Sequence, residues 1–239
     1  MKLLDMTAIR LLQLGSVAMM TGALVACGGG SSSGSPPTGT IDGTAAIGAA
    51  LANATVQMTC KNGSGSATTN SSGAYSATFA FDGPCFLTAT SGSIVMNSMA
   101  SGAGSYNVTP LTTLLLSYIA AQLGTTVSGL ESGIQSNTSF QSALSSSTVV
   151  GNAETAVATL LQTSYGVTLS TSSFLTTSFV PGQPGLDADL DALQTAGAID
   201  STGTPASSLT TAAAAAGASA PITTSGSGPT GGTGASSGS

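Results

Sequence analysis

Few side chains of this chain could do covalent, acid–base or metal-binding chemistry. The sequence has nine acidic residues, three basic residues and no histidine. Histidine is the commonest general base and metal ligand, so its absence excludes His-dependent catalytic triads and most zinc sites. The reactive or ligating candidates that remain are three cysteines and a row of alternate aspartates: Cys27, Cys60, Cys85, Asp187, Asp189 and Asp191. We predict no catalytic residue and no cofactor.

Alternate aspartates such as Asp187, Asp189 and Asp191 are the candidate metal ligands, because calcium loops carry carboxylates at this spacing. An EF-hand loop would need glycine at its sixth position and glutamate at its twelfth, where this chain has Ala192 and Ala198. The competing interpretation is the first turn of a helix, where the helix dipole favours anions and where Asp187 and Asp191 would face solvent. We therefore predict no metal site.

The first 27 residues have the order of an export signal. Lys2 and Arg10 precede an apolar run over residues 11–25, and small residues precede Cys27. The basic N-terminus stays on the cytoplasmic side of the membrane while the apolar run enters the translocon. Small residues at the cleavage site let a signal peptidase reach the backbone. An uncleaved anchor is the alternative, but the run is shorter than the ~20 residues of a spanning helix. A plain secretory signal also remains open.

Residues 24–27 (LVAC) resemble the lipobox of bacterial lipoproteins. The resemblance implies cleavage between Ala26 and Cys27 and acylation of Cys27, which becomes the first residue of the mature chain. The next residue is Gly28, whereas aspartate at this position would keep such proteins in the inner membrane. The resemblance therefore implies sorting to the outer membrane. Several acyl chains, at ~0.8 kcal/mol per buried methylene, would make the membrane attachment permanent.

Charge is unusually scarce. Charged residues make up 5% of the chain, against roughly 25% in ordinary domains. Removal of residues 1–26 leaves Lys61 as the only basic residue. One lysine cannot neutralise a phosphate backbone, so nucleic acid is excluded as a partner. Lys61 lies in a predicted turn, where we expect exposure and no Ser–Lys dyad.

Acylation of Cys27 would leave Cys60 and Cys85 as an even pair. Such a pair usually bridges in an oxidising compartment, and the closed loop of about 25 residues would add roughly 3–4 kcal/mol of stability. Two buried free thiols are the alternative.

The chain divides into five segments by composition and periodicity. We expect a signal peptide at residues 1–26, a flexible Gly/Ser tether at 27–39, a β-sandwich at 40–108, a helical subdomain at 109–200 and a disordered tail at 201–239. The fold class is α+β, a small antiparallel sandwich followed by a compact all-α unit. The tail has no charge and no aromatic residue beyond Asp200. Burial of its apolar surface is therefore not expected to offset the conformational entropy that the tail would lose on ordering.

The sandwich is predicted from period-two alternation in residues 54–60, 75–81 and 85–89. Residues 48–56 (GAALANATV), 72–75 (SGAY) and 86–89 (FLTA) look like the carboxypeptidase regulatory-like, transthyretin-like sandwich. The match is degenerate, with Ser72 where that family usually has aspartate. The resemblance implies a structural or binding unit without catalysis.

Helices are predicted from caps and apolar spacing. Thr109 is a suitable N-cap, with Pro110 at the first helical position and Gly124 just past the end. Short helices are expected around residues 127–134 and 140–144. A longer helix is expected to be capped by Asn152 and to end at Gly166, and a last one carries Leu186, Leu190 and Leu193. The runs NVTPLTTLL and GLDADLDAL are similar to a group of uncharacterised bacterial lipoproteins.

Together these features predict a non-catalytic, membrane-anchored envelope lipoprotein, a structural or binding module displayed from the outer membrane. The sequence does not specify which face of that membrane it occupies. An envelope protein or a glycan is the expected partner. A carbohydrate-binding module is the alternative, and its stacking residues would be the four tyrosines, since the chain has no tryptophan: Tyr75, Tyr106, Tyr118 and Tyr165.

Overall fold

The computed structural model describes residues 35–222. The predicted signal peptide (residues 1–26), the predicted lipidation site Cys27 and most of the predicted tether lie outside the described residues, as do residues 223–239.

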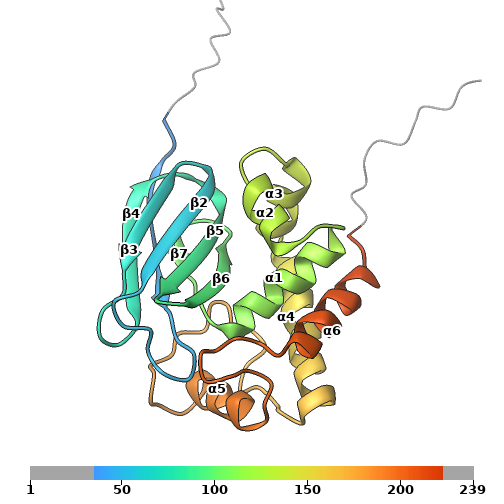
Figure 1. Cartoon of the computed structure of the whole chain (residues 1–239). Helices are drawn as coiled ribbons and strands as arrows, with labels where there is room; N and C mark the ends of the chain where they lie inside the picture. The colour runs from blue at the N-terminus through green and yellow to red at the C-terminus, as the bar shows by residue number, and fades with distance from the viewer. Residues whose placement is uncertain (1–34, 223–239) are drawn as a thin grey trace, which may run out of the picture. The chain divides into compact units, whose positions relative to one another are not determined.

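Within residues 35–222, seven strands form two sheets, one with the order β4-β1-β7 and the other β3-β2-β5-β6 (Figure 1). All neighbours are antiparallel except the short β1–β7 pair, which is parallel. The strands are β1 Thr38–Thr44, β2 Thr55–Asn62, β3 Ser64–Thr68, β4 Ala74–Ala80, β5 Asp82–Ser91, β6 Ile94–Ala100 and β7 Gly104–Ser105. The first strand thus begins inside the segment predicted as tether.

In the described part of the chain six helices follow the strands, which confirms the predicted α+β class. They are α1 Pro110–Gln122, α2 Val127–Gly133, α3 Thr138–Ser145, α4 Ser147–Tyr165, α5 Leu186–Thr195 and α6 Ser207–Ala218.

The alternation predicted for β2 is confirmed. Val56, Met58 and Cys60 are buried, and Gln57 between them is exposed, because one face of the strand packs inward and the other faces solvent. The alternation predicted for β5 is wrong at Phe86, which is also buried. Helix α3 contacts this strand and covers it in part, whereas Thr90 further along the strand is exposed.

A disulfide joins β2 to β5. The antiparallel register places Cys60 opposite Cys85, and both residues are completely buried. The pairing suggested by the cysteine count is therefore present, and it lies within the core.

Local sequence determines both ends of α1. The Thr109 hydroxyl accepts a hydrogen bond from the Thr112 N–H, and the Thr112 hydroxyl accepts one from the Thr109 N–H, which makes a capping box. Gly124 follows the helix with φ +67°, a conformation that costs glycine no steric strain. The predicted start and end of this helix are confirmed.

The predicted start of α4 is wrong. Its N-cap is Ser146, whose hydroxyl accepts the Val149 N–H, and not Asn152. Serine is as good a cap as asparagine, and the capping residue that lies closer to α3 is the one that the chain uses. The helix ends at Gly166, as predicted.

Sheets and helices share one hydrophobic core. The buried residues of both segments form a single cluster, and α1 contacts β6, α4 and α6 (Figure 1). The residues predicted as a separate helical subdomain therefore have no core of their own. Within residues 35–222, no single helix is long and apolar enough to cross a membrane. Helices α1 and α2 taken together have sufficient length and apolar composition, but they are bent by 79° relative to each other.

Helix α6 lies within residues 201–239, which were predicted to be disordered, so that prediction is wrong for residues 207–218. Leu209, Ala213 and Gly217 recur at helical spacing and are buried, and α6 runs beside α1. The apolar area within the tail alone is too small to offset the entropy lost on ordering, but the tail also packs against α1. Small side chains let the two backbones approach closely, so α6 gains contacts from a partner helix that is already in place.

Gly217→Ala is expected to lower the free energy of unfolding by about 1–3 kcal/mol, because its methyl group would overlap the Tyr118 carbonyl oxygen of α1. Gly151→Ala in α4 is the matched control. An added Cβ there meets nothing within 4 Å, so this variant should gain about 0.5–1 kcal/mol. Urea denaturation followed by circular dichroism measures both. Wild-type stability for Gly217→Ala would contradict the close packing of α6 on α1.

Candidate functional site

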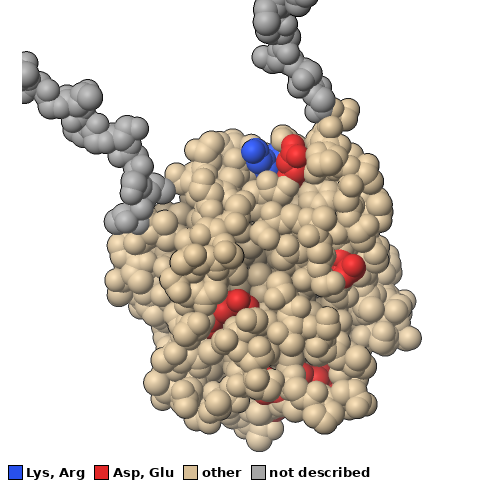
Figure 2. All heavy atoms as spheres, turned by 180° about the vertical axis from the view of Figure 1, so that it is seen from behind, with Lys and Arg blue, Asp and Glu red and all other residues tan. Residues whose placement is uncertain are grey.

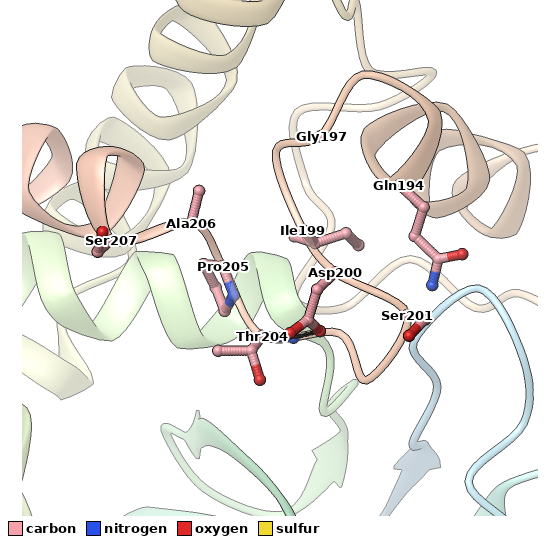
Figure 3. Close-up of a pocket in the computed structure, with 9 residues that line it drawn as sticks. All are labelled: Gln194, Gly197, Ile199, Asp200, Ser201, Thr204, Pro205, Ala206 and Ser207. Carbon is pink, nitrogen blue, oxygen red and sulfur yellow. Dashed lines mark hydrogen bonds between the residues drawn. The ribbon is translucent and has the colours of Figure 1, made fainter.

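An open hollow of about 690 Å³, the Asp200 pocket, lies between the end of α5 at Gln194, the loop of residues 197–206 and the start of α6 at Ser207 (Figure 3). Its one charged side chain, Asp200, points along its own loop. One carboxylate oxygen accepts hydrogen bonds from the Thr202 hydroxyl at 2.6 Å, the Thr202 N–H at 2.8 Å and the Thr204 N–H at 2.9 Å.

These hydrogen bonds, that of the Thr202 hydroxyl first, lower the pKa of Asp200. The carboxylate is therefore occupied in shaping the loop. The hollow holds no second charged group, and we assign it a structural role.

A more enclosed cavity of about 290 Å³, the Glu154 pocket, lies where the second sheet meets the helices. Its buried wall consists of side chains from β6, the segment after β7, α3, α4 and the segment between α4 and α5. These residues are Met99, Tyr106, Leu144, Val150, Glu154 and Leu175. Its exposed wall carries the hydroxyl side chains of serines and a threonine. The cavity thus combines an apolar base, one carboxylate and a hydroxyl-rich opening.

Glu154 is the charged group of this cavity and is only 7% exposed. Its Oε1 accepts the Leu175 N–H at 2.8 Å. Burial raises the pKa of Glu154, and the hydrogen bond from Leu175 offsets part of that rise. No basic side chain lines the cavity, because Lys61, the one basic residue that the structure describes, lies exposed in β2.

Two elements hold the segment that faces Glu154. The Asn107 side-chain amide donates to the Phe174 carbonyl at 3.0 Å and to the Thr177 carbonyl at 2.8 Å, and the Asn107 N–H donates to the Leu175 carbonyl at 2.7 Å. Glu154 holds the same segment from the helix side. The wall of the cavity is therefore fixed both from the strands and from α4.

Glu154 was not among the site residues predicted from the sequence. A lone glutamate in a helix is usually solvent-exposed, but Val150, Val157 and Leu161 lie four residues before and three and seven residues after it. That spacing puts Glu154 on the buried face of α4, so the helical period alone could have identified it.

The predicted aspartates do not converge on a common point. Gly182 N–H donates to Asp187 Oδ2 at 2.7 Å, and the Ser170 N–H and hydroxyl donate to Asp189 Oδ2 at 2.9 and 2.6 Å. Within residues 35–222 no group of three or more His, Cys, Asp or Glu side chains is placed to hold a metal ion. Asp191 is exposed.

The expected solvent exposure of Asp187 is wrong, since it is 2% exposed. The long segment between α4 and α5 folds over the start of α5 and uses its carboxylates as hydrogen-bond acceptors. Burial raises the pKa of Asp187, its bond to Gly182 lowers it, and Asp191 raises it further.

The tyrosines considered for sugar stacking are internal. Tyr75, Tyr106 and Tyr118 are buried, and Tyr165 is partly buried against the core. The Tyr75 hydroxyl donates to the Tyr106 carbonyl at 2.6 Å, and burial, with Asp42 nearby, raises its pKa. The three buried tyrosines offer no exposed ring face of the kind that carbohydrate sites present, and Tyr165 is only partly exposed.

Comparison with known proteins adds little. No family model matches the chain, and no curated protein matches it significantly. A distant structural neighbour is the crystal structure of a DUF3823 family protein from Parabacteroides merdae ATCC 43184, with a TM-score of 0.24 and 21% identity. The match covers 30% of this chain and 45% of that one, so the chain spans less than half the length of that protein.

We expect the free energy of unfolding of the wild type, relative to that of Glu154→Gln, to fall as the pH rises above about 4.5. The folded protein raises the pKa of Glu154 and so favours the protonated carboxyl. This stabilisation is complete below the unfolded-state pKa and is lost as the pH rises through the higher folded-state pKa. Glutamine can still accept the Leu175 N–H and does not titrate.

Urea denaturation at several pH values measures the difference. Glu131→Gln, which removes a carboxylate from an exposed position on α2, should keep the wild-type profile. Parallel profiles for the wild type and Glu154→Gln would refute the burial of this carboxyl.

Proposed function

We propose that the protein is a lipid-anchored envelope lipoprotein whose folded part is a non-catalytic structural or binding module. The observation that carries the proposal is the tetrapeptide at residues 24–27, LVAC, placed directly after a basic and then apolar stretch. Acylation at Cys27 would hold the folded part close to a bilayer. The first strand of the folded part, β1, begins at Thr38, a short distance along the chain from Cys27.

The cysteine usage supports this proposal. A disulfide between Cys60 and Cys85 is typical of proteins outside the reducing cytoplasm. The chain has three cysteines, so Cys27, the one in the lipobox-like tetrapeptide, is the one outside this pair. The number and placement of the cysteines therefore agree with one lipid attachment and one structural bridge.

The chemistry of the described residues favours a non-catalytic role. Four carboxylates, those of Glu154, Asp187, Asp189 and Asp200, accept backbone N–H bonds of nearby loops. They serve as structural acceptors, and no histidine is present to act as a general base.

We also propose that the sheets are a divergent carboxypeptidase regulatory-like sandwich. The motif residues of that resemblance fall on the connection into β2, on the turn before β4 and on β5. The turn glycine of the motif, Gly73, has φ +79°, and a Cβ there would overlap the Ala45 carbonyl oxygen. A module of this kind on the outer membrane would contact an envelope protein or a glycan.

Metabolic labelling with an alkyne fatty acid tests the anchor. The wild-type chain should be labelled and should start at an acylated Cys27, as read by mass spectrometry of its N-terminal peptide. Cys27→Ser should be unlabelled and should either retain residues 1–26 or be released. An unlabelled wild type that begins at Met1 would refute the proposal.

Gly28→Asp tests the predicted destination. If the resemblance holds, this variant should stay acylated but move from the outer-membrane to the inner-membrane fraction. Gly34→Asp, which adds the same charge further along the chain, is the matched control and should fractionate as wild type. A glycan array on the acylated chain then separates a sugar partner from a protein partner.

A further inference from the structure

The second carboxylate oxygen of Glu154 has no partner in the structure. Oε1 accepts the Leu175 N–H, whereas no hydrogen bond within residues 35–222 reaches Oε2. Oε2 is not fully enclosed, and Glu154 is one of the residues that line the cavity of about 290 Å³. Glu154 as a residue is 7% exposed, and a carboxylate oxygen without a partner in such a place is costly unless a donor reaches it.

We propose that the Glu154 pocket binds a small organic cation, a primary ammonium compound with a short apolar body. An ammonium group carries three donors and a positive charge, and it would pair with Oε2 in a site where water screens the attraction poorly. Residues 35–222 supply no such partner, since Lys61 is the one basic residue among them and is exposed on β2.

The remaining wall matches the rest of such a molecule. Met99, Leu144, Val150 and Leu175 are buried and would contact a short carbon chain, while the Tyr106 ring is an aromatic surface that favours a cation. The Tyr106 hydroxyl is 2.9 Å from the Ser101 hydroxyl, one of the polar groups on the exposed wall. A volume of about 290 Å³ suits a small molecule rather than a peptide segment.

Other ligand classes fit less well. An anion would meet the Glu154 carboxylate with no basic group to offset it. A divalent metal ion needs several oxygen ligands, and no group of three ligating side chains occurs among residues 35–222. The proposal does not depend on the lipid anchor, so its failure and that of the proposed function are distinguishable.

Titration of the full chain with n-butylammonium chloride, followed by methyl NMR, tests the proposal. The methyl signals of Leu144, Val150 and Leu175 should shift saturably. Butyrate and 1-butanol, which keep the carbon chain but carry a negative or no charge, should bind at least about tenfold more weakly.

Three variants locate the site. Glu154→Gln keeps an acceptor for Leu175 and should weaken butylammonium binding by about tenfold or more. Glu131→Gln removes an exposed carboxylate and should bind as wild type. Gly151 lines the cavity and an added Cβ there meets open space, so Gly151→Leu should fold and obstruct binding.

Absence of saturable shifts with butylammonium, or equal affinity for butylammonium and 1-butanol, would overturn the proposal. Unchanged affinity in Glu154→Gln, with a wild-type circular dichroism spectrum, would also overturn it. Saturable shifts that persist in Gly151→Leu would place the cation elsewhere and likewise count against it.

Discussion

The contact between the first turn of α1 and strand β6 connects the sheets to the helices. The Thr112 hydroxyl donates to the Asn97 carbonyl at 2.8 Å, and the Asn97 N–H donates to the Thr113 hydroxyl at 3.0 Å. These bonds occupy backbone groups of an edge strand that would otherwise be open to pairing with another chain. Helix α1 is consequently buried on most of its surface, and α4 and α6 pack on the side away from the sheet. The single core, the order of α6 and the position of Glu154 all depend on where α1 lies.

Scarcity of charge shapes the rest of the molecule. Figure 2 shows a surface on which charged side chains are few and scattered, so its polarity comes mainly from hydroxyl, amide and backbone groups. Several of the carboxylates are used inside as acceptors for loop N–H groups, at Glu154, Asp187 and Asp189. Long loops need such acceptors because their backbone groups lack strand or helix partners. Asp187 Oδ1 is also buried without a partner, but it is fully enclosed, whereas Glu154 lines a cavity. Asp200, by contrast, lies in the open hollow at the start of α6.

Parts of the fold that rest on local contacts were predictable. The capping box at Thr109, the stop at Gly124 and the alternation of Val56, Met58 and Cys60 each involve residues close together in the chain. The start of α4 was not predictable to the residue, since Ser146 and Asn152 are both acceptable caps and packing against α3 decides between them. The candidate site could be predicted only in part: the period of α4 places Glu154 inward, but its partner at Leu175 is far along the chain.

The sequence by itself determined the α+β class, the absence of histidine-based chemistry, the even cysteine pair and the lipobox-like tetrapeptide, because these follow from residue type, count and short-range spacing. Tertiary structure alone decided that residues 207–218 are ordered, that Asp187 is buried and that a cavity opens beside Glu154. The physical reason is that small side chains and lone carboxylates carry little local preference. Their state depends on partners such as Tyr118 for Gly217, which the chain supplies only once distant segments have come together.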